Sequence, residues 1–290
     1  RSRRPLPELR ITVGGLLTEA RARLREVGVE DAPREAARIW AGLFRIPTGE
    51  AWLGRERRAT EAEAERFADA VERRAAGEPL AYVTGWTGFR RLTVATDRRA
   101  LIPRPETEGL VELVLAQRPD GVVADAGTGT GCIALALADE GRYEAVHAAE
   151  LDPGAFALAG ENIRATGLRV RLHRGDLVAP LLGLGLDVLV SNPPYVSEAE
   201  CDALDASVRE WEPRVALASG PDGLHHTRRL LDEGRAALRS EGLIALELDA
   251  TRAAASAEVA RDLGWTDIAV HRDLYGRERY LTARRSKESA

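Results

Sequence analysis

The chain has 290 residues, of which 44% are hydrophobic and 30% are charged. This composition excludes a disordered or fibrous protein, and the length is sufficient to bury a core without disulfides. The formal net charge of −5 argues against a dedicated nucleic-acid binder, which usually presents a basic face to phosphates. Cys132 and Cys201 are too few for a disulfide framework and lack metal-ligand spacing, so we expect reduced thiols and no metal site.

The start of the chain does not predict a signal peptide, because Arg1 to Arg4 lead into Pro5 and Pro7 rather than into an apolar run. No stretch approaches the ~18 consecutive apolar residues that a membrane helix needs. We therefore expect a cytoplasmic protein without membrane association.

Residues 1–77 predict a small bundle of amphipathic helices. The apolar residues at helical spacing are Leu16, Leu17, Ala20 and Leu24 in one segment and Ala36, Ile39, Trp40 and Leu43 in the next. A further helix is expected to begin at Thr60, because Thr60 and Glu63 match a capping box, and to end near Gly77. The bundle is the predicted N-terminal domain.

Residues 78–105 predict a linker with a β-hairpin, because Pro79, Gly85 and Gly88 precede an alternating pattern at 92–94. From residue 106 to 290, helical and strand patterns alternate, which is typical of a mostly parallel sheet covered by helices on both faces. The expected strands are 121–125, 145–150, 169–173, 187–191 and 243–248, with helices at 153–166 and 224–238 and an antiparallel edge hairpin at 266–270 and 278–282.

A glycine-rich turn follows the first of these strands. It consists of Gly127, Thr128, Gly129, Thr130 and Gly131. Glycines let the backbone approach a ligand closely, and ligands bind at such strand ends in doubly wound sheets. A dinucleotide turn would place a tightly packed small residue at Cys132, and Asp125 would repel a pyrophosphate. A carboxylate suits the ammonium and sulfonium of S-adenosylmethionine, so the turn favours that cofactor without excluding a dinucleotide.

The ends of the next two strands support an adenosine-containing ligand. Glu150 ends the second strand, where an acidic side chain accepts hydrogen bonds from both ribose hydroxyls of either cofactor class. Asp176 and Leu177 follow the third strand, where a side chain is placed to bond the adenine amine or to pack against the ring.

The fourth strand runs directly into Asn192, Pro193, Pro194 and Tyr195. Two prolines fix φ and stop the strand abruptly, which leaves the loop carbonyls free to accept hydrogen bonds. An Asn oxygen and a Pro carbonyl together accept both hydrogens of a planar NH2 group and aim its lone pair at a sulfonium methyl, while Tyr195 packs against the flat substrate group. The loop therefore predicts methyl transfer to glutamine, adenine or guanine, with Asn192, Pro193 and Tyr195 as catalytic residues.

The sequence resembles the release factor glutamine methyltransferases, the HemK/PrmC family, over nearly its whole length. The matching motifs are residues 77–85 with Phe89, residues 101–108, 125–131 and 192–195, residues 212–217, and residues 223–224. The Pro-Arg-Pro-Glu-Thr-Glu segment within 101–108 is the most discriminating, because nucleic-acid methyltransferases that share Asn-Pro-Pro-Tyr generally lack it.

The resemblance implies a Rossmann-like class I methyltransferase domain preceded by a small helical domain that helps grip the release factor. It implies methylation of the glutamine N5 in the Gly-Gly-Gln loop of peptide chain release factors, with S-adenosylmethionine as cofactor and S-adenosylhomocysteine as product. It places cofactor contacts on Gly127 to Gly131, Glu150, Leu177 and Asn192. Leu177 replaces a frequent aromatic residue, Glu150 replaces the usual Asp, and Asp249 stands where the family generally has Gly.

Two other interpretations remain open at this point. The first is an N-methyltransferase that acts on adenine or guanine of nucleic acid, and the second is a binding module that holds S-adenosylmethionine without turnover. We expect a monomer with no nucleic-acid substrate. His225 and His226 are expected to have structural or surface roles, because adjacent residues on a helix do not share a face.

Overall fold

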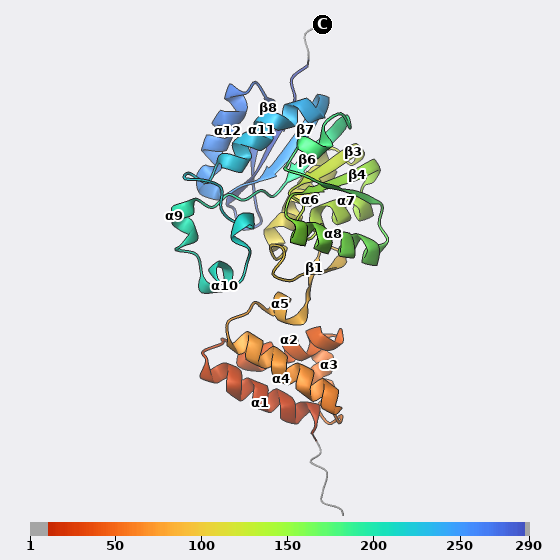
Figure 1. Ribbon diagram of the computed structural model, residues 1–290, viewed down its shortest axis with the longest axis vertical. Helices are drawn as coiled ribbons and strands as arrows, with labels where there is room; N and C mark the ends of the chain where they lie inside the picture. The colour runs from red at the N-terminus through yellow and green to blue at the C-terminus, as the bar shows by residue number, and fades with distance from the viewer. Residues whose placement is uncertain (1–10, 288–290) are drawn as a thin grey trace, which may run out of the picture. The chain divides into compact units, whose positions relative to one another are not determined.

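The computed structural model describes residues 11–287. Residues 1–10, on which the signal-peptide expectation rests, and residues 288–290 lie outside the described part. The chain forms two compact units that divide between Trp86 and Thr87, inside the segment 78–105 that the sequence predicts as a linker (Figure 1). Within residues 11–287, no helix is long and apolar enough to cross a membrane.

The first unit is helical, as predicted. Its helices are α1 (Val13–Glu26), α2 (Ala32–Phe44), α3 (Thr48–Leu53), α4 (Glu61–Ala75) and α5 (Leu80–Thr84). The predicted capping box is present, because Thr60 Oγ1 accepts a hydrogen bond from Glu63 N and the Glu63 carboxylate accepts one from Thr60 N. Trp40 packs edge-on against Phe67 with ring centroids 5.1 Å apart, so two aromatic rings form the centre of the bundle core.

A two-stranded hairpin begins at the boundary between the units, and the second unit continues into a seven-stranded sheet. The hairpin strands are β1 (Trp86–Phe89) and β2 (Leu92–Ala95). The sheet strands are β3 (Asp120–Ala126), β4 (Arg142–Glu150), β5 (Val170–Arg174), β6 (Leu186–Ser191), β7 (Leu238–Glu247), β8 (Thr266–Arg272) and β9 (Glu278–Arg284). Their order is β5-β4-β3-β6-β7-β9-β8, in which β9 runs antiparallel to its neighbours β7 and β8 and the pairs from β5 to β7 are parallel. The predicted parallel sheet and its antiparallel edge hairpin are therefore confirmed.

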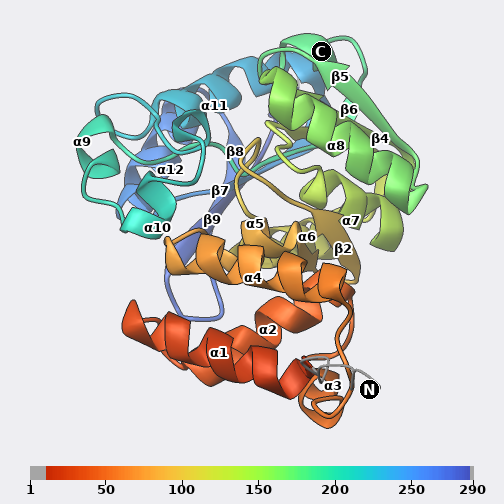
Figure 2. The same cartoon turned by 60° about the horizontal axis from the view of Figure 1, so that its bottom comes forward.

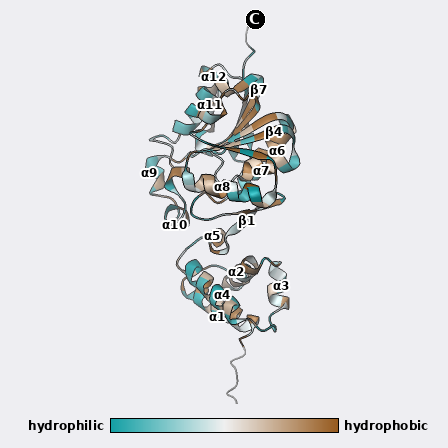
Figure 3. Cartoon of the chain, turned by 45° about the vertical axis from the view of Figure 1, so that its right-hand side comes forward, coloured by the Kyte–Doolittle hydropathy of each residue, from teal (hydrophilic) through white to brown (hydrophobic). Residues whose placement is uncertain are grey.

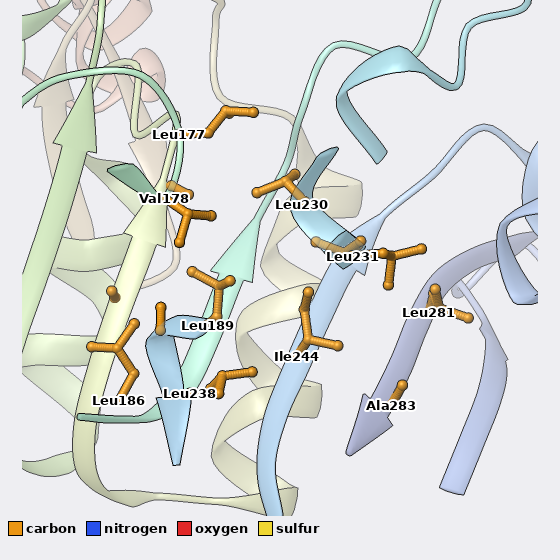
Figure 4. Close-up of a cluster of buried hydrophobic side chains, with 14 of the residues drawn as sticks. Leu177, Val178, Leu186, Leu189, Leu230, Leu231, Leu238, Ile244, Leu281 and Ala283 are labelled. Atoms are coloured by element: carbon orange, nitrogen blue, oxygen red, sulfur yellow. The ribbon is translucent and has the colours of Figure 1, made fainter. Parts of the chain in front are cut away.

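Helices cover both faces of this sheet. They are α6 (Pro105–Gln117), α7 (Cys132–Glu140), α8 (Pro153–Thr166), α9 (Glu198–Cys201), α10 (Ala206–Arg209), α11 (His225–Ala237) and α12 (Ala253–Asp262). One core lies between the sheet and α6 and α7, and the other lies between the sheet and α11 and α12 (Figure 2). The central strands β3, β6 and β7 are largely hydrophobic because most of their residues are buried on both faces of the sheet (Figure 3). In Figure 4, Leu189 and Ile244 of the sheet lie near Leu230 and Leu231 of α11.

Several predicted boundaries differ from the structure, and the start of β7 differs most, because the strand expected at 243–248 spans Leu238–Glu247. The helix expected at 224–238 ends at Ala237, and Leu238 instead begins β7, where it pairs with Leu186 of β6. Leu238 is buried against the sheet, so strand pairing determines its conformation rather than the helical pattern that precedes it. The short helices α9 and α10 are not among the predicted elements.

The strand order brings two predicted loops together. Parallel strands end at the same edge of a sheet, and β3 and β6 are direct neighbours with Asp125 opposite Val190. At this edge, Ser191 Oγ donates a hydrogen bond to the Ala126 carbonyl at 2.6 Å. The glycine turn after β3 and the Asn-Pro-Pro-Tyr loop after β6 therefore begin side by side.

Candidate active site

A cavity of about 330 Å³ lies at this edge of the sheet. Most of the predicted site residues line it, namely Gly127, Thr128, Gly129, Thr130, Glu150, Asp176, Leu177, Asn192 and Pro194. Gly131, Pro193 and Tyr195 are not among the lining residues. Gly131 is the N-cap of α7. Pro193 is buried, and Tyr195, which follows Pro194, is half-buried.

The glycine turn has the conformation that its glycines allow. Gly127, Gly129 and Gly131 have φ of 72°, 57° and 85°, a region that other residues rarely adopt. The amides of Gly127 and Thr128 both donate to the Ala149 carbonyl, at 2.9 and 3.0 Å. These bonds join the turn to the end of β4, so two strand ends shape one side of the cavity.

Asp125 is a fully buried carboxyl group immediately before this turn. Its Oδ2 accepts a hydrogen bond from the Thr128 hydroxyl, whereas Oδ1 has no hydrogen-bond partner within residues 11–287. Burial raises the pKa of Asp125 to about 7. Asp125 is not among the residues that line the cavity, but a buried carboxylate so close to the glycine turn favours a cationic ligand over an anionic one.

Glu150 is held in place by backbone amides. Oε2 accepts from Gly129 N at 2.9 Å, and Oε1 accepts from Leu151 N and Asp152 N, each at 2.9 Å. These bonds fix the carboxylate at the cavity wall and leave part of its acceptor capacity for a ligand.

Asp176 and Leu177 form another part of the wall. Asp176 Oδ2 makes an ion pair with Arg229 Nη1 at 2.9 Å, so one of its oxygens is already engaged. Leu177 has φ of 42° and is buried, with its side chain in the core cluster drawn in Figure 4. This residue presents an apolar surface to the cavity.

A residue of helix α6 holds the side chain of Asn192. Its Nδ2 donates a hydrogen bond to Thr107 Oγ1 at 3.1 Å. Burial, followed by the nearby Glu247 carboxylate, raises the pKa of Tyr195, so this phenol remains neutral at ordinary pH. The loop therefore presents amide, carbonyl and neutral aromatic groups, and it holds no charged base.

Two segments that sequence reasoning did not assign to the site form a further wall. Residues 99–104 and residues 213, 215 and 216 line the cavity. Glu212 joins them, because its carboxylate accepts hydrogen bonds from Ile102 N at 3.2 Å and from the Arg104 guanidinium. Arg98 also lies over the Trp211 ring, 4.0 Å from its centroid. The motifs at 101–108 and 212–217 could have indicated these walls of the cavity, but in the sequence analysis they served only as the basis of the family resemblance.

The structure gives two other groups clearer roles. His226 lines the cavity, and its Nδ1 lies 3.0 Å from Ser219 Oγ, although sequence reasoning expected a structural or surface position.

No cluster within residues 11–287 has the three or more groups that would hold a metal ion. Cys132 also lines the cavity, and burial raises the pKa of its thiol to about 12, so it is not an activated nucleophile.

Asp249 has a local structural explanation. Its φ is −73°, so the backbone does not need glycine at this position. Its Oδ1 accepts hydrogen bonds from Thr251 N at 2.9 Å and from the Thr251 hydroxyl. Asp249 therefore caps the short turn after β7.

Comparison with known proteins covers both units. Residues 15–85 match the family described as PrmC N-terminal domain, and residues 106–209 match the methyltransferase small domain. A release factor glutamine methyltransferase from Moorella thermoacetica is 43% identical over 286 residues, which cover 96% of this chain and 100% of that protein. Another, from Nitratidesulfovibrio vulgaris, is 40% identical over 286 residues, covering 95% of this chain and 96% of that protein.

The solved structures support the fold. A methyltransferase from Pyrococcus furiosus has a TM-score of 0.51 at 22% identity and covers 67% of this chain and 89% of its own. The predicted Rossmann-like class I methyltransferase fold, with S-adenosylmethionine as cofactor, is confirmed. Because identity of about 40% extends over nearly the full length of the relatives, the chain belongs to the release factor glutamine methyltransferase family.

Proposed function

We propose that this enzyme transfers a methyl group from S-adenosylmethionine to the side-chain N5 of the glutamine in the Gly-Gly-Gln loop of peptide chain release factors. The proposal rests on the observation that Asn192 and the glycine turn line the same cavity. The substrate follows from the full-length relatives, which are named release factor glutamine methyltransferases. Methylation of this glutamine would support translation termination.

The residues of the cavity fit the proposed cofactor. The bound cofactor supplies an electrophilic methyl group on a sulfonium. Glu150 would accept hydrogen bonds from the ribose hydroxyls, and Leu177 would pack against the adenine, with Asp176 at its edge. Asp125, buried with one unpartnered oxygen among the described residues, would favour the positive charge of the cofactor. Residues 127–131 would let the backbone approach the methionine portion.

The Asn-Pro-Pro-Tyr loop would hold the acceptor amide. The amide nitrogen of glutamine is a poor nucleophile because its lone pair is delocalised. Asn192 Oδ1 and the Pro193 carbonyl would accept its two hydrogens, fix the nitrogen and favour a pyramidal geometry that aims the lone pair at the methyl carbon. Pro194 would keep the loop rigid, and Tyr195 would pack against the planar amide. The methylated nitrogen loses its proton after attack, so no strong base is needed beforehand.

The remaining parts of the proposal concern the partner and the setting. The helical unit, predicted to span residues 1–77, would help grip the release factor, whose Gly-Gly-Gln loop enters the cavity. The methyltransferase unit, predicted as residues 106–290 after the hairpin segment 78–105, would carry the chemistry. The enzyme would act in the cytoplasm as a monomer, without a nucleic-acid substrate.

Mass spectrometry tests the proposal directly. Purified enzyme is incubated with a release factor and S-adenosylmethionine, and the Gly-Gly-Gln peptide is analysed. We expect one added methyl group on the glutamine side chain. Transfer of labelled methyl to RNA or DNA, but not to release factors, would replace the proposal with the nucleic-acid alternative. Cofactor binding without transfer to either substrate would favour a binding module.

A further inference from the structure

Two segments outside the sheet form one wall of the cavity. The first is residues 98–104, which lie between β2 and α6, and the second is residues 211–216, which follow α10. Residues 99–104 of the first segment and residues 213, 215 and 216 of the second line the cavity. Because neither segment pairs with a strand of the sheet, other contacts must determine the shape of this wall.

Glu212 makes the contacts that join the two segments. Its side chain is only 2% exposed. Its carboxylate accepts hydrogen bonds from the Ile102 amide at 3.2 Å and from the Arg104 guanidinium. Arg98 adds a further contact, because its guanidinium lies 4.0 Å from the centroid of the Trp211 ring. The two segments are therefore linked at both side chains and main chain.

Stability alone does not explain a buried ion pair in this wall. Removal of two charges from water costs about as much free energy as their attraction returns, so two apolar side chains would join the segments equally well. An ion pair differs from an apolar contact in its geometry, because a guanidinium and a carboxylate bond in a narrow range of orientations. Glu212 also bonds to the Ile102 amide and so fixes the path of the main chain. Its contacts determine the shape of the wall.

The start of segment 98–104 lies beside the glycine turn. A Cβ added at Gly129 would lie 4.0 Å from the Ala100 Cβ. Arg99 makes an ion pair of 2.8 Å with Glu161 of α8, so this end of the segment has a support of its own. The contacts of Glu212 are not needed at the cofactor end.

The other end of the segment lies beside the loop that would hold the acceptor amide. Ile102 and Arg104 come just before the third residue of α6, Thr107, which accepts the hydrogen bond from Asn192 Nδ2 at 3.1 Å. Glu212 therefore fixes the part of the segment that is next to the support of Asn192.

Segment 211–216 is joined to the same loop. Val196 directly follows the Asn-Pro-Pro-Tyr residues, and its amide donates to the Leu217 carbonyl at 2.9 Å. Val215 lines the cavity and is nevertheless 63% exposed, so this part of the wall borders the opening to solvent. A protein substrate must enter through an opening of this kind. Both segments that Glu212 joins thus lie on the acceptor side of the cavity.

We propose that Glu212 and Arg104 are positioning residues that fix the acceptor side of the cavity wall, so that the substrate glutamine enters in the orientation that Asn192 requires. This inference rests on the proposed function. Arg104 lines the cavity and Glu212 does not, so the Glu212 carboxylate acts through the Ile102 main chain and the Arg104 side chain.

Glu212→Gln tests the pair at nearly constant shape. The new NH2 group would face either the Ile102 amide or the Arg104 guanidinium, so one donor would lose its acceptor. We expect kcat at saturating cofactor and release factor to fall about 10-fold, because the bound glutamine is aimed correctly less often. The KM for the release factor and the Kd for S-adenosylmethionine should each rise less than about twofold, because the remaining contacts are unchanged.

Asp187→Asn is the matched control. The Asp187 carboxylate is also buried, and it accepts hydrogen bonds from the Val122 amide at 2.8 Å and from the guanidinium groups of Arg118 and Arg239. Like Glu212, it joins a backbone amide to arginine. It lies near the start of β6, at the opposite edge of the sheet from the cavity, and does not line the cavity. This variant should lose at least as much stability as Glu212→Gln and keep its kcat.

Arg104→Gln distinguishes positioning from direct contact with the substrate. If Arg104 acts together with Glu212, the variant that carries both substitutions should have a kcat close to that of the more impaired single variant. If Arg104 instead contacts the substrate independently, the two losses should multiply.

Four results would overturn the inference. They are an unchanged kcat in Glu212→Gln, an equal loss of kcat in Asp187→Asn, a rise in KM or cofactor Kd as large as the fall in kcat, and multiplied losses in the double variant. Melting temperatures identify a variant that fails to fold, and if Glu212→Gln does so, the kcat and KM of Arg104→Gln decide. An unsubstituted enzyme that does not methylate release factors would instead contradict the proposed function, so the two failures are distinguishable.

Discussion

The loops after β3 and β6 begin side by side but are built in opposite ways. The loop after β3 contains three glycines with positive φ, and backbone amides fix its shape. The loop after β6 contains two prolines, whose rings fix φ, and a side-chain bond from Asn192 to Thr107 holds its key amide. The first loop lets a ligand approach the main chain closely, whereas the second holds acceptor groups rigidly.

This contrast suggests a division of labour. A close approach of the backbone suits binding of the cofactor, which the enzyme must take up and release. Rigid hydrogen-bond acceptors suit the substrate amide that receives the methyl group. Orientation of its nitrogen lowers the barrier only if that orientation is maintained in the transition state. Changes after β6 should therefore affect kcat, and changes around the β3 turn should affect cofactor affinity.

Asn192→Ala should have the largest effect. Loss of the amide oxygen leaves one substrate hydrogen without its acceptor and the nitrogen poorly aimed, so we expect kcat to fall by about 100-fold or more. The Kd for S-adenosylmethionine should remain within about threefold of the original value. Calorimetry and a methyl-transfer assay measure the two quantities. Full transfer activity in this variant would remove Asn192 from the mechanism.

Glu150→Gln should have the next largest effect, but on binding. The Glu150 carboxylate accepts three backbone N–H groups, and a Gln side chain would turn its NH2 group toward at least one of them. We expect the cofactor Kd to rise about 10-fold or more, with kcat at saturation nearly unchanged. Glu144→Gln, the same change at an exposed position of β4, is the control and should leave the Kd unaltered. A fall in kcat as large as the rise in Kd would contradict the assignment of Glu150 to cofactor binding alone.

The pH dependence of cofactor binding tests the role of Asp125. Its pKa is raised to about 7 by burial, so the group is mostly neutral at pH 6 and mostly ionised at pH 8. A cationic ligand favours the ionised form, so affinity should increase as pH rises through 7, by about fivefold between pH 6 and pH 7.5. Calorimetry in two buffers would detect the accompanying release of protons. Asp125→Asn should bind more weakly and show no such increase.

Several features of this contrast were predictable because their signals are local in sequence. The glycine turn, Glu150 and Asn192 each follow a strand directly, and the alternation of helices and strands indicates that these strand ends share one edge. The boundary between α11 and β7 was not predictable from periodicity, because Leu238 pairs with Leu186, a distant residue in sequence. Pairing across the sheet overrode the local pattern there.

The support behind Asn192 was not predictable for the same reason. Thr107 lies 85 positions before Asn192 and on a different element. Nothing in the local pattern around Thr107 indicates that its hydroxyl bonds to the Asn192 side chain. The wall formed by residues 99–104 with Glu212 likewise depends on contacts across more than a hundred positions. Partners that are so distant in sequence can be identified only when the fold is known.

Gly129→Ala should give the smallest effect. Gly129 has φ of 57°, and an added Cβ would meet only the Ala100 Cβ at 4.0 Å, so the substitution introduces conformational strain without a clash. We expect a loss of about 1 kcal/mol in the free energy of unfolding and a rise of about threefold in cofactor Kd, as the turn relaxes away from its binding shape.

Gly167→Ala separates these two consequences. Gly167 has φ of 70° with open space around it, but it ends α8 and does not line the cavity. This variant should lose a similar amount of stability, measured by urea denaturation, while its cofactor Kd stays unchanged. Equal changes in Kd for both variants would mean that general destabilisation, rather than the shape of the turn, controls affinity. If only Gly129→Ala weakens binding, and kcat at saturating cofactor is retained, backbone freedom at the β3 turn serves the cofactor alone.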